Sequence, residues 1–258
     1  CSLDHAILVS MDCPGRLENK DYLALAAEKT NLGEAFPVDM SFQEKLTVTC
    51  ASCDAFIPDS ADLQFCVTGM DGKLGVKAGT AKGENIAARL NLSKSEEPQG
   101  RAEALSQLAG VRKQRKTALF EETTSTLKSV EGFQTAISRC INCYNCRAAC
   151  PVCYCRECVF LTDVFAYPPD MILERSKRRG PVKMPMDTTM FHMTRMSHIA
   201  HACVGCGQCT SVCPSSIPVA DLFRTVAEKT QSYFGYMPGR DVLEPIPQLV
   251  AKKGQRQE

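Results

Sequence analysis

The sequence lacks long hydrophobic runs, and it lacks an excess of either charge. Its apolar stretches, such as 6–9 and 159–161, fall far short of the roughly 20 residues that a membrane-spanning helix requires, so we expect no membrane span. Thirty Lys and Arg residues stand against 29 Asp and Glu residues, which leaves a formal net charge of +1. Wholesale binding to nucleic acid or to an anionic membrane is therefore not expected.

Signatures of export and of nucleotide binding are also missing. No charged segment followed by an apolar segment and a cleavage site opens the chain, so we expect a reducing, cytoplasmic setting. Neither G-x-G-x-x-G nor a P-loop motif occurs, so the sequence does not indicate a Rossmann-type or P-loop nucleotide-binding domain. Because the chain begins at Cys1 and a predicted strand follows almost at once, we expect further residues to precede it. The 258 residues, 44% of them hydrophobic, suffice for one or two domains with a core.

Cysteine, by contrast, is abundant. The sequence holds 16 cysteines, about 6% of its residues and several times ordinary usage, and in a reducing setting thiolates that bind metal are favoured over disulfides. The spacing C-x2-C-x2-C-x3-C-P occurs twice, at Cys140, Cys143, Cys146, Cys150 and Pro151 and again at Cys203, Cys206, Cys209, Cys213 and Pro214. This spacing is typical of proteins with two [4Fe–4S] clusters, in which the fourth cysteine of each run binds the other cluster.

The repeated run therefore predicts a crossed assignment of ligands. The first cluster takes Cys140, Cys143, Cys146 and Cys213, and the second takes Cys203, Cys206, Cys209 and Cys150. The alternative is a pair of zinc sites, but zinc needs only four ligands and gives no reason for two copies of the full run.

Six further cysteines fall into two groups. Cys13, Cys50 and Cys53 follow predicted strands at 6–9 and 46–49, while Cys153, Cys155 and Cys158 lie just beyond the first run. Together the groups predict a third cluster, with a structural zinc site or unligated thiols near the other cubes as alternatives. Cys66 alternates with Leu63 and Phe65 in a predicted strand, and we interpret it as a small core residue.

The pattern of elements predicts an α/β N-terminal domain and an α-rich, ferredoxin-like C-terminal domain with two [4Fe–4S] clusters. In residues 1–100 we expect strands at 6–9, 46–49, 62–68 and 74–77, helices at 20–29 and 84–92, and turns at 12–15, 71–72 and 82–83. Residues 101–139 are predicted to form a helical linker. The C-terminal domain spans residues 140–258, with helices at 190–201 and 219–234 and an insertion at 159–202.

Two features of the insertion allow two interpretations each. The basic run 175–179 either attracts an acidic partner subunit or an anionic coenzyme, or forms a solvated face, which we favour. His192 and His198 either donate a hydrogen bond to a cluster sulfide or satisfy a backbone carbonyl, which we also favour.

Several motifs together carry a family resemblance. They are D-C-P-G at 12–15, C-x2-C at 50–53, G-T-A-K-G-E at 79–84, F-H-M-T-R-M-S-H at 191–198 and the two cysteine runs. In these motifs the chain resembles the beta-subunit family of coenzyme F420-dependent hydrogenases and formate dehydrogenases, specifically the longer, formate dehydrogenase type with a C-terminal module of two [4Fe–4S] clusters.

The resemblance implies an α/β domain that holds FAD and its own [4Fe–4S] cluster, the flavin exchanging a hydride with the deazaflavin coenzyme F420. It assigns Cys13, Cys50 and Cys53 to this third cluster and leaves the fourth ligand open among Cys153, Cys155, Cys158 and an upstream residue. Thr80, Lys82 and Gly83 become candidates for phosphate contacts, with a plain turn at 82–83 as the alternative. No catalytic residue is assigned.

The resulting hypothesis is an oxidoreductase subunit of a hetero-oligomeric, anaerobic, cytoplasmic complex. It would pass electrons between a flavin or F420 site and a catalytic formate dehydrogenase or hydrogenase subunit through [4Fe–4S] clusters. One alternative is a pure electron-transfer adapter without a coenzyme site, linked to a heterodisulfide-reductase-like complex. The other is a zinc-stapled structural or regulatory protein.

Overall fold

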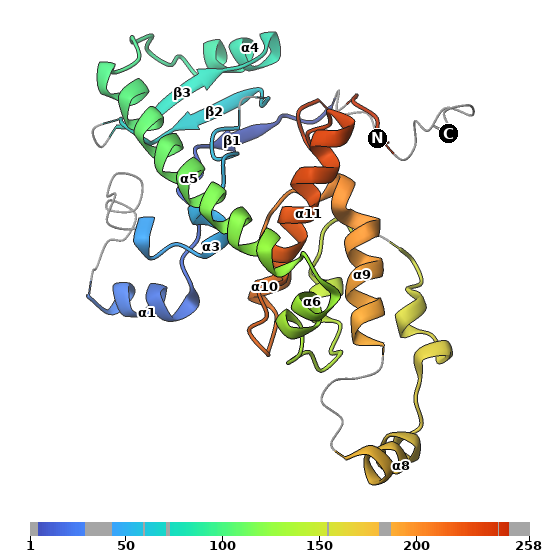
Figure 1. Ribbon diagram of the computed structural model, residues 1–258. Coiled ribbons are helices and arrows are strands. Elements are labelled where there is room, and N and C mark those ends of the chain that lie inside the picture. Colours follow the sequence, from blue (N-terminus) through green and yellow to red (C-terminus); the bar gives the residue numbers. More distant parts are fainter. Residues whose placement is uncertain are drawn as a thin grey trace. The chain divides into compact units, whose positions relative to one another are not determined.

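The computed structural model describes residues 5–28, 43–58, 60–70, 73–153, 155–180, 187–241 and 243–247 (Figure 1). The chain divides into two compact units, a first unit of residues 1–118 and a second unit of residues 119–258. The division falls within helix α5 (Gln99–Thr126). Among the helices of the described residues, none is both long enough and apolar enough to cross a membrane.

The first unit combines a small mixed sheet with helices. Its described elements in chain order are β1 (Val9–Met11), α1 (Asn19–Glu28), α3 (Val48–Ala51), β2 (Leu63–Cys66), β3 (Gly75–Ala78), α4 (Ala81–Arg89) and the first part of α5. Strand β2 lies in the middle, parallel to β1 and antiparallel to β3. Leu63 and Cys66 of β2 are buried, which confirms the interpretation of Cys66 as a core residue. The predicted mixture of strands and helices in this part of the chain is therefore confirmed.

Two local predictions in the first unit are wrong. Residues 46–49 form no strand, because Thr47 caps helix α3 and its hydroxyl accepts a hydrogen bond from the Cys50 N–H at 3.4 Å. The β-branched residues at 47–49 had suggested a strand. Residues 82–83 form no separate turn, because they lie in the first turn of α4, which begins three residues before the predicted start. Strand β1 also begins three residues later than predicted. The predicted turn at 71–72 lies outside the described residues.

A buried ion pair joins the start of α5 to the end of β1. Arg101 and Asp12 are 3% and 0% exposed, with Nη1 to Oδ2 at 2.7 Å and Nη2 to Oδ1 at 3.1 Å. The backbone N–H groups of Val67 and Thr68 also donate to Asp12. Burial opposes ionisation, but these hydrogen bonds hold the pKa of Asp12 below its usual value. The network fixes the backbone directly before Cys13.

The second unit is helical wherever the structure describes regular elements. In chain order they are the end of α5, α6 (Val130–Ala136), α7 (Asn145–Ala148), η2 (Val159–Leu161), η3 (Asp163–Phe165), α8 (Pro169–Arg179), α9 (Thr188–Ile199), η4 (Ala200–Ala202), α10 (Gln208–Ser211) and α11 (Val219–Phe234). The predicted helix at 219–234 is confirmed with both ends, since Pro218 precedes it and Gly235, with φ +59°, terminates it. The helix predicted at 190–201 corresponds to α9 and η4.

The core of the second unit is built around cysteines. Helices α9 and α11 lie side by side (Figure 1), and their residues Ile199 and Phe223 are buried with Phe133, Ile137 and Ile217. Four partly buried cysteines pack against this cluster: Cys140, Cys150, Cys209 and Cys213. Members of both cysteine runs thus pack against the same apolar core.

Candidate iron–sulfur centres

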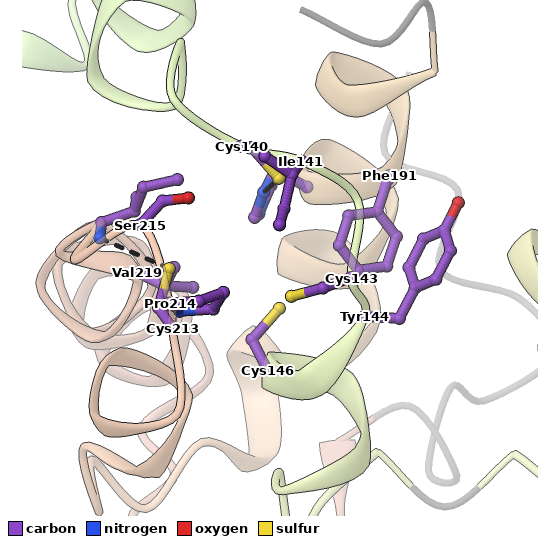
Figure 2. A pocket seen from close by; sticks show the side chains of 12 residues that line it. Cys140, Ile141, Cys143, Tyr144, Cys146, Phe191, Cys213, Pro214, Ser215 and Val219 are labelled. Carbon is purple, nitrogen blue, oxygen red and sulfur yellow. Dashed lines mark hydrogen bonds between the residues drawn. The ribbon is translucent and has the colours of Figure 1, made fainter.

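The first three cysteines of the first run and the last cysteine of the second run line one cavity. The lining of this cavity includes Cys140, Cys143, Cys146 and Cys213, together with Phe191, His192 and Ile217. Figure 2 shows the four cysteine side chains around it, three from the 140–146 loop and one from the segment that precedes α11. The fold therefore gathers at one place the four residues that the sequence predicts as ligands of the first cluster.

A second cavity gathers the complementary set. It is lined by Cys203, Cys206, Cys209 and Cys150, with Gly205, Gly207, Phe223 and Arg224 among the other lining residues. Each cavity thus takes three cysteines from one run and the fourth from the other. This is the arrangement that the crossed assignment requires.

The two loops have matching backbone conformations. Asn142 and Tyr144 in the first run have φ of 53° and 58°, and Gly205 and Gly207 at the same places in the second run have φ of 66° and 76°. Glycine adopts this left-handed conformation freely and asparagine tolerates it, whereas tyrosine does so at a cost. Both runs therefore adopt the same left-handed backbone conformation at these two places. Because Tyr144 does so at a cost, the first run needs stabilising contacts from outside the loop.

Asp187 supplies that support at the start of α9. Its buried carboxylate accepts a hydrogen bond from Asn142 Nδ2 at 2.7 Å and one from the Tyr144 hydroxyl at 3.1 Å. Burial, and then the neighbouring carboxylate, raises the pKa of Tyr144 to about 12, so this hydroxyl remains a donor. Thr188 adds a hydrogen bond to Asn142 Oδ1 at 2.7 Å. The insertion between the runs thus holds the first loop in shape.

Hydrogen bonds reach the sulfur atoms of the first cavity. The Asn142 and Ile217 N–H groups donate to Cys140 Sγ and Cys213 Sγ, both at 3.4 Å. His192 is 1% exposed, and its Nε2 lies 3.4 Å from Cys140 Sγ, while its Nδ1 has no partner in the described structure. The carbonyl interpretation of His192 is therefore wrong, because its neighbour is a cysteine sulfur. His198 is exposed.

The electrostatic environment of the thiols fits a cationic cluster core. Burial raises the pKa of Cys146 to about 11 and that of Cys209 to about 12, with the Arg195 charge opposing it in both cases. Burial likewise raises the pKa of Cys140 and of Cys203. Thiolates at these places need a compensating cation, which iron provides when it binds.

A single-ion site finds no support in the described part of the chain. No three Cys, His, Asp or Glu side chains within the described ranges converge as ligands of one metal ion. A [4Fe–4S] cube instead distributes four thiolates over four irons. The donor set, the cavities and the crossed pairing therefore fit clusters better than zinc.

The cysteines predicted for a third cluster are divided between the units. The first unit holds Cys13, Cys50 and Cys53, and the second unit holds Cys153, Cys155 and Cys158. In the second unit, Arg147 donates to the Cys155 carbonyl at 3.1 Å, and Cys158 packs against the buried Phe160 and Phe191.

Arg112 is a neighbour of the first group that the sequence did not reveal. It is 1% exposed, donates to the Pro14 carbonyl at 2.9 Å and lies with its guanidinium carbon 4.7 Å from the centre of the Phe56 ring. Burial lowers the pKa of Arg112, and three nearby thiols act in the opposite direction: Cys53, Cys13 and Cys50. No carboxylate among the described residues pairs with Arg112. The three cysteines are therefore close enough to a buried cation to act on its charge.

Comparisons with known proteins agree with this geometry. Residues 136–217 match the family model of the 4Fe-4S dicluster domain. The chain is 36% identical over 113 residues to the F420-dependent formate dehydrogenase subunit beta of Methanocaldococcus jannaschii, which covers 44% of this chain and 26% of that protein. It is 35% identical over 210 residues to the F420-dependent formate dehydrogenase 1 subunit beta of Methanococcus maripaludis, which covers 75% of this chain and 49% of that protein.

The curated homologues of this chain are formate dehydrogenase beta subunits. The resemblance in the sequence motifs is thereby confirmed, and the C-terminal region contains a 4Fe-4S dicluster domain, as predicted. The chain spans about a quarter of the length of one of these beta subunits and about half of the other.

The candidates for phosphate contacts have structural roles in the first unit. The Thr80 hydroxyl caps α4 by accepting from the Gly83 N–H at 3.1 Å, and it donates to Asp62 Oδ1 at 2.6 Å. Lys82 donates to the Ala6 carbonyl. A Cβ on Gly83 would lie 1.8 Å from the Asp62 carbonyl oxygen, so only glycine allows this close approach. Each of the three residues thus has a structural role in the folded protein, and their contact with a phosphate stays a prediction.

Proposed function

We propose that this chain is the electron-transfer part of a formate dehydrogenase- or hydrogenase-type beta subunit, passing electrons between a flavin or F420 site and a catalytic partner subunit. The observation that carries the proposal is the pair of cavities in the second unit, each lined by three cysteines of one run and the fourth of the other. When bound, [4Fe–4S] clusters accept and return single electrons. The names of the homologues support the choice of complex.

The residues of the chain would bind and insulate the two clusters. Four thiols at each cavity supply the ligands, and buried apolar side chains such as Phe191 and Phe223 exclude water. N–H groups directed at sulfur stabilise added negative charge, and burial sets how strongly that charge is felt. These are the means by which a protein adjusts the potential of a cluster without taking part in bond chemistry.

The proposal extends to the first unit. A third cluster would use Cys13, Cys50 and Cys53, with the fourth ligand from Cys153, Cys155, Cys158 or an upstream residue. The buried, positively charged Arg112 beside the three thiols supports an anionic group there. The family resemblance supports FAD as a further cofactor and coenzyme F420 as the substrate. The complex would be a cytoplasmic hetero-oligomer.

The test is a count of iron, sulfide and flavin per chain in native, full-length protein purified without oxygen. About twelve irons with one flavin would support three clusters and the flavin-linked function, because each cube holds four irons. About eight irons without flavin would support the adapter alternative with heterodisulfide-reductase-like partners. Colourless protein that contains zinc would overturn the proposal altogether.

A further inference from the structure

Arg195 is a buried arginine that contacts a predicted cluster ligand directly. It lies on α9 and is 3% exposed. Its Nη1 donates to Cys146 Sγ at 3.1 Å, and its Nη2 donates to the Cys146 carbonyl at 3.0 Å. The two-pronged contact fixes the guanidinium plane against the third cysteine of the first run.

The same guanidinium also lies next to the second site. Its central carbon is 5.5 Å from the centre of the Phe191 ring, which lines the first cavity, and 5.1 Å from the Phe223 ring, which lines the second. Arg195 therefore stands between the two cavities.

The charge of Arg195 has no counterion in the described structure. No described carboxylate pairs with it, and its Nε has no hydrogen-bond partner there. The second cavity has Arg224 in its lining as well. A buried cation without a counterion is costly, so the arrangement calls for anionic groups on either side of Arg195.

We propose that Arg195 is the shared counterion of both clusters and a positioning residue that raises both reduction potentials. The inference rests on the proposed function, since it takes the two cavities as cluster sites. Reduction adds one electron and one negative charge to a cube, no bond forms or breaks, and the guanidinium keeps its proton. A nearby cation favours the reduced form at both sites through charge, and at the first site also through the N–H to Cys146 Sγ.

The test is an oxygen-free redox titration of the full chain followed by electron paramagnetic resonance, comparing wild type with Arg195→Gln and Arg195→Lys. The variants Cys140→Ser and Cys203→Ser assign the two signals. In Arg195→Gln we expect the equilibrium constant for reduction to fall about tenfold or more at both clusters, which corresponds to about 59 mV for one electron. In Arg195→Lys, which keeps the charge but loses the planar fork, the first cluster should shift more than the second.

Arg139→Gln is the matched control. Arg139 is exposed, and it donates to the Ser216 carbonyl at 3.2 Å, near Cys213. Its substitution therefore also removes one positive charge near the first cavity, but this charge is exposed to solvent. We expect it to change both constants by less than about twofold, because water screens its charge. The inference would be overturned if the cluster reduction potentials of Arg195→Gln matched those of Arg139→Gln. It would also be overturned if Arg195→Gln shifted the potential of one cluster alone.

The iron count separates this failure from failure of the proposed function. If wild type contains no iron–sulfur clusters, the proposed function itself fails. If wild type and both variants contain the same amount of iron and their clusters have the same reduction potentials, only the role of Arg195 fails. If Arg195→Gln loses iron, Arg195→Lys decides the question. Iron restored by lysine would support the role of the charge, whereas iron lost in Arg195→Lys as well would show a purely structural role and overturn the inference.

Discussion

Cys213 belongs to the second run by sequence but lines the first cavity. We therefore expect Cys213→Ala to disturb the cluster of Cys140, Cys143 and Cys146. Double variants make the test independent of signal assignment. Cys140→Ala with Cys213→Ala should lose about four irons, no more than either single variant, whereas Cys203→Ala with Cys213→Ala should lose about eight. Iron analysis of anaerobic protein measures both, and the reverse pattern would refute the crossed pairing.

Arg112 offers a second residue-scale test. Arg112→Met leaves the partly buried Pro14 carbonyl without its charged donor, so the free energy of unfolding should fall by about 1–3 kcal/mol in denaturant titrations. It should also lower the iron bound in the first unit, because the cation beside Cys13, Cys50 and Cys53 is gone. Arg115→Met is the control, since Arg115 donates to the Gln43 carbonyl at 2.6 Å. Equal iron in both variants would contradict the electrostatic role.

These residues show which parts of the site the sequence reveals. The cysteine groups follow from local spacing, because three ligands of each cube lie within seven consecutive residues. Arg195 and Arg112 lie 49 and 98 residues from the groups they contact, Cys146 and Pro14, and an isolated arginine carries no local pattern. Only the tertiary fold brings them to the cysteines.

Helix α4 provides a test at the scale of one element. Gly83 lies in its first turn, where a Cβ would approach the Asp62 carbonyl oxygen to 1.8 Å. Gly83→Ala should therefore lower the free energy of unfolding by about 1–3 kcal/mol, because the helix must move from β2 or strain its backbone. Urea unfolding of the whole chain measures this loss.

Gly110 of α5 is the control for that substitution. A Cβ there has nothing within 4 Å, and the position is exposed within a helix. Gly110→Ala should raise the free energy of unfolding by about 0.4–1 kcal/mol, because alanine favours the helix. If both variants changed stability in the same direction, close packing of α4 on the Asp62 backbone would not be the cause.

Helices and strands were predictable from the sequence where its different local signals agreed. Helix α11 has an apolar face together with Pro218 and Gly235 at its ends, so periodicity and end signals agree. At residues 46–49 they conflicted: β-branched side chains favour a strand, while Thr47 is a helix cap. The cap prevailed, and this moved Cys50 from a strand end into α3.

At the scale of the whole molecule, the two units stabilise themselves by different means. The first unit has its own apolar cluster, Leu17, Leu25, Leu46 and Ala51, and the buried ion pair of Asp12 and Arg101. The core of the second unit has Cys140, Cys150, Cys209 and Cys213 packed along its edge. A group bound by those cysteines links the two cysteine runs, which pack against the core residues of α9 and α11, so its loss removes cross-links from the second unit above all.

We therefore expect oxidative removal of the clusters to unfold the second unit first. Hydrogen exchange of the whole chain, with and without clusters, measures this by segment. Amides of α11 and α9 should lose protection after cluster removal, while amides of β2 keep most of theirs, because the ion pair and the sheet do not depend on iron in the second unit. Unchanged protection of α11 would mean that its apolar face alone holds the core. That result would make the cavities preformed and the clusters dispensable for folding, and it would leave their role to electron transfer alone.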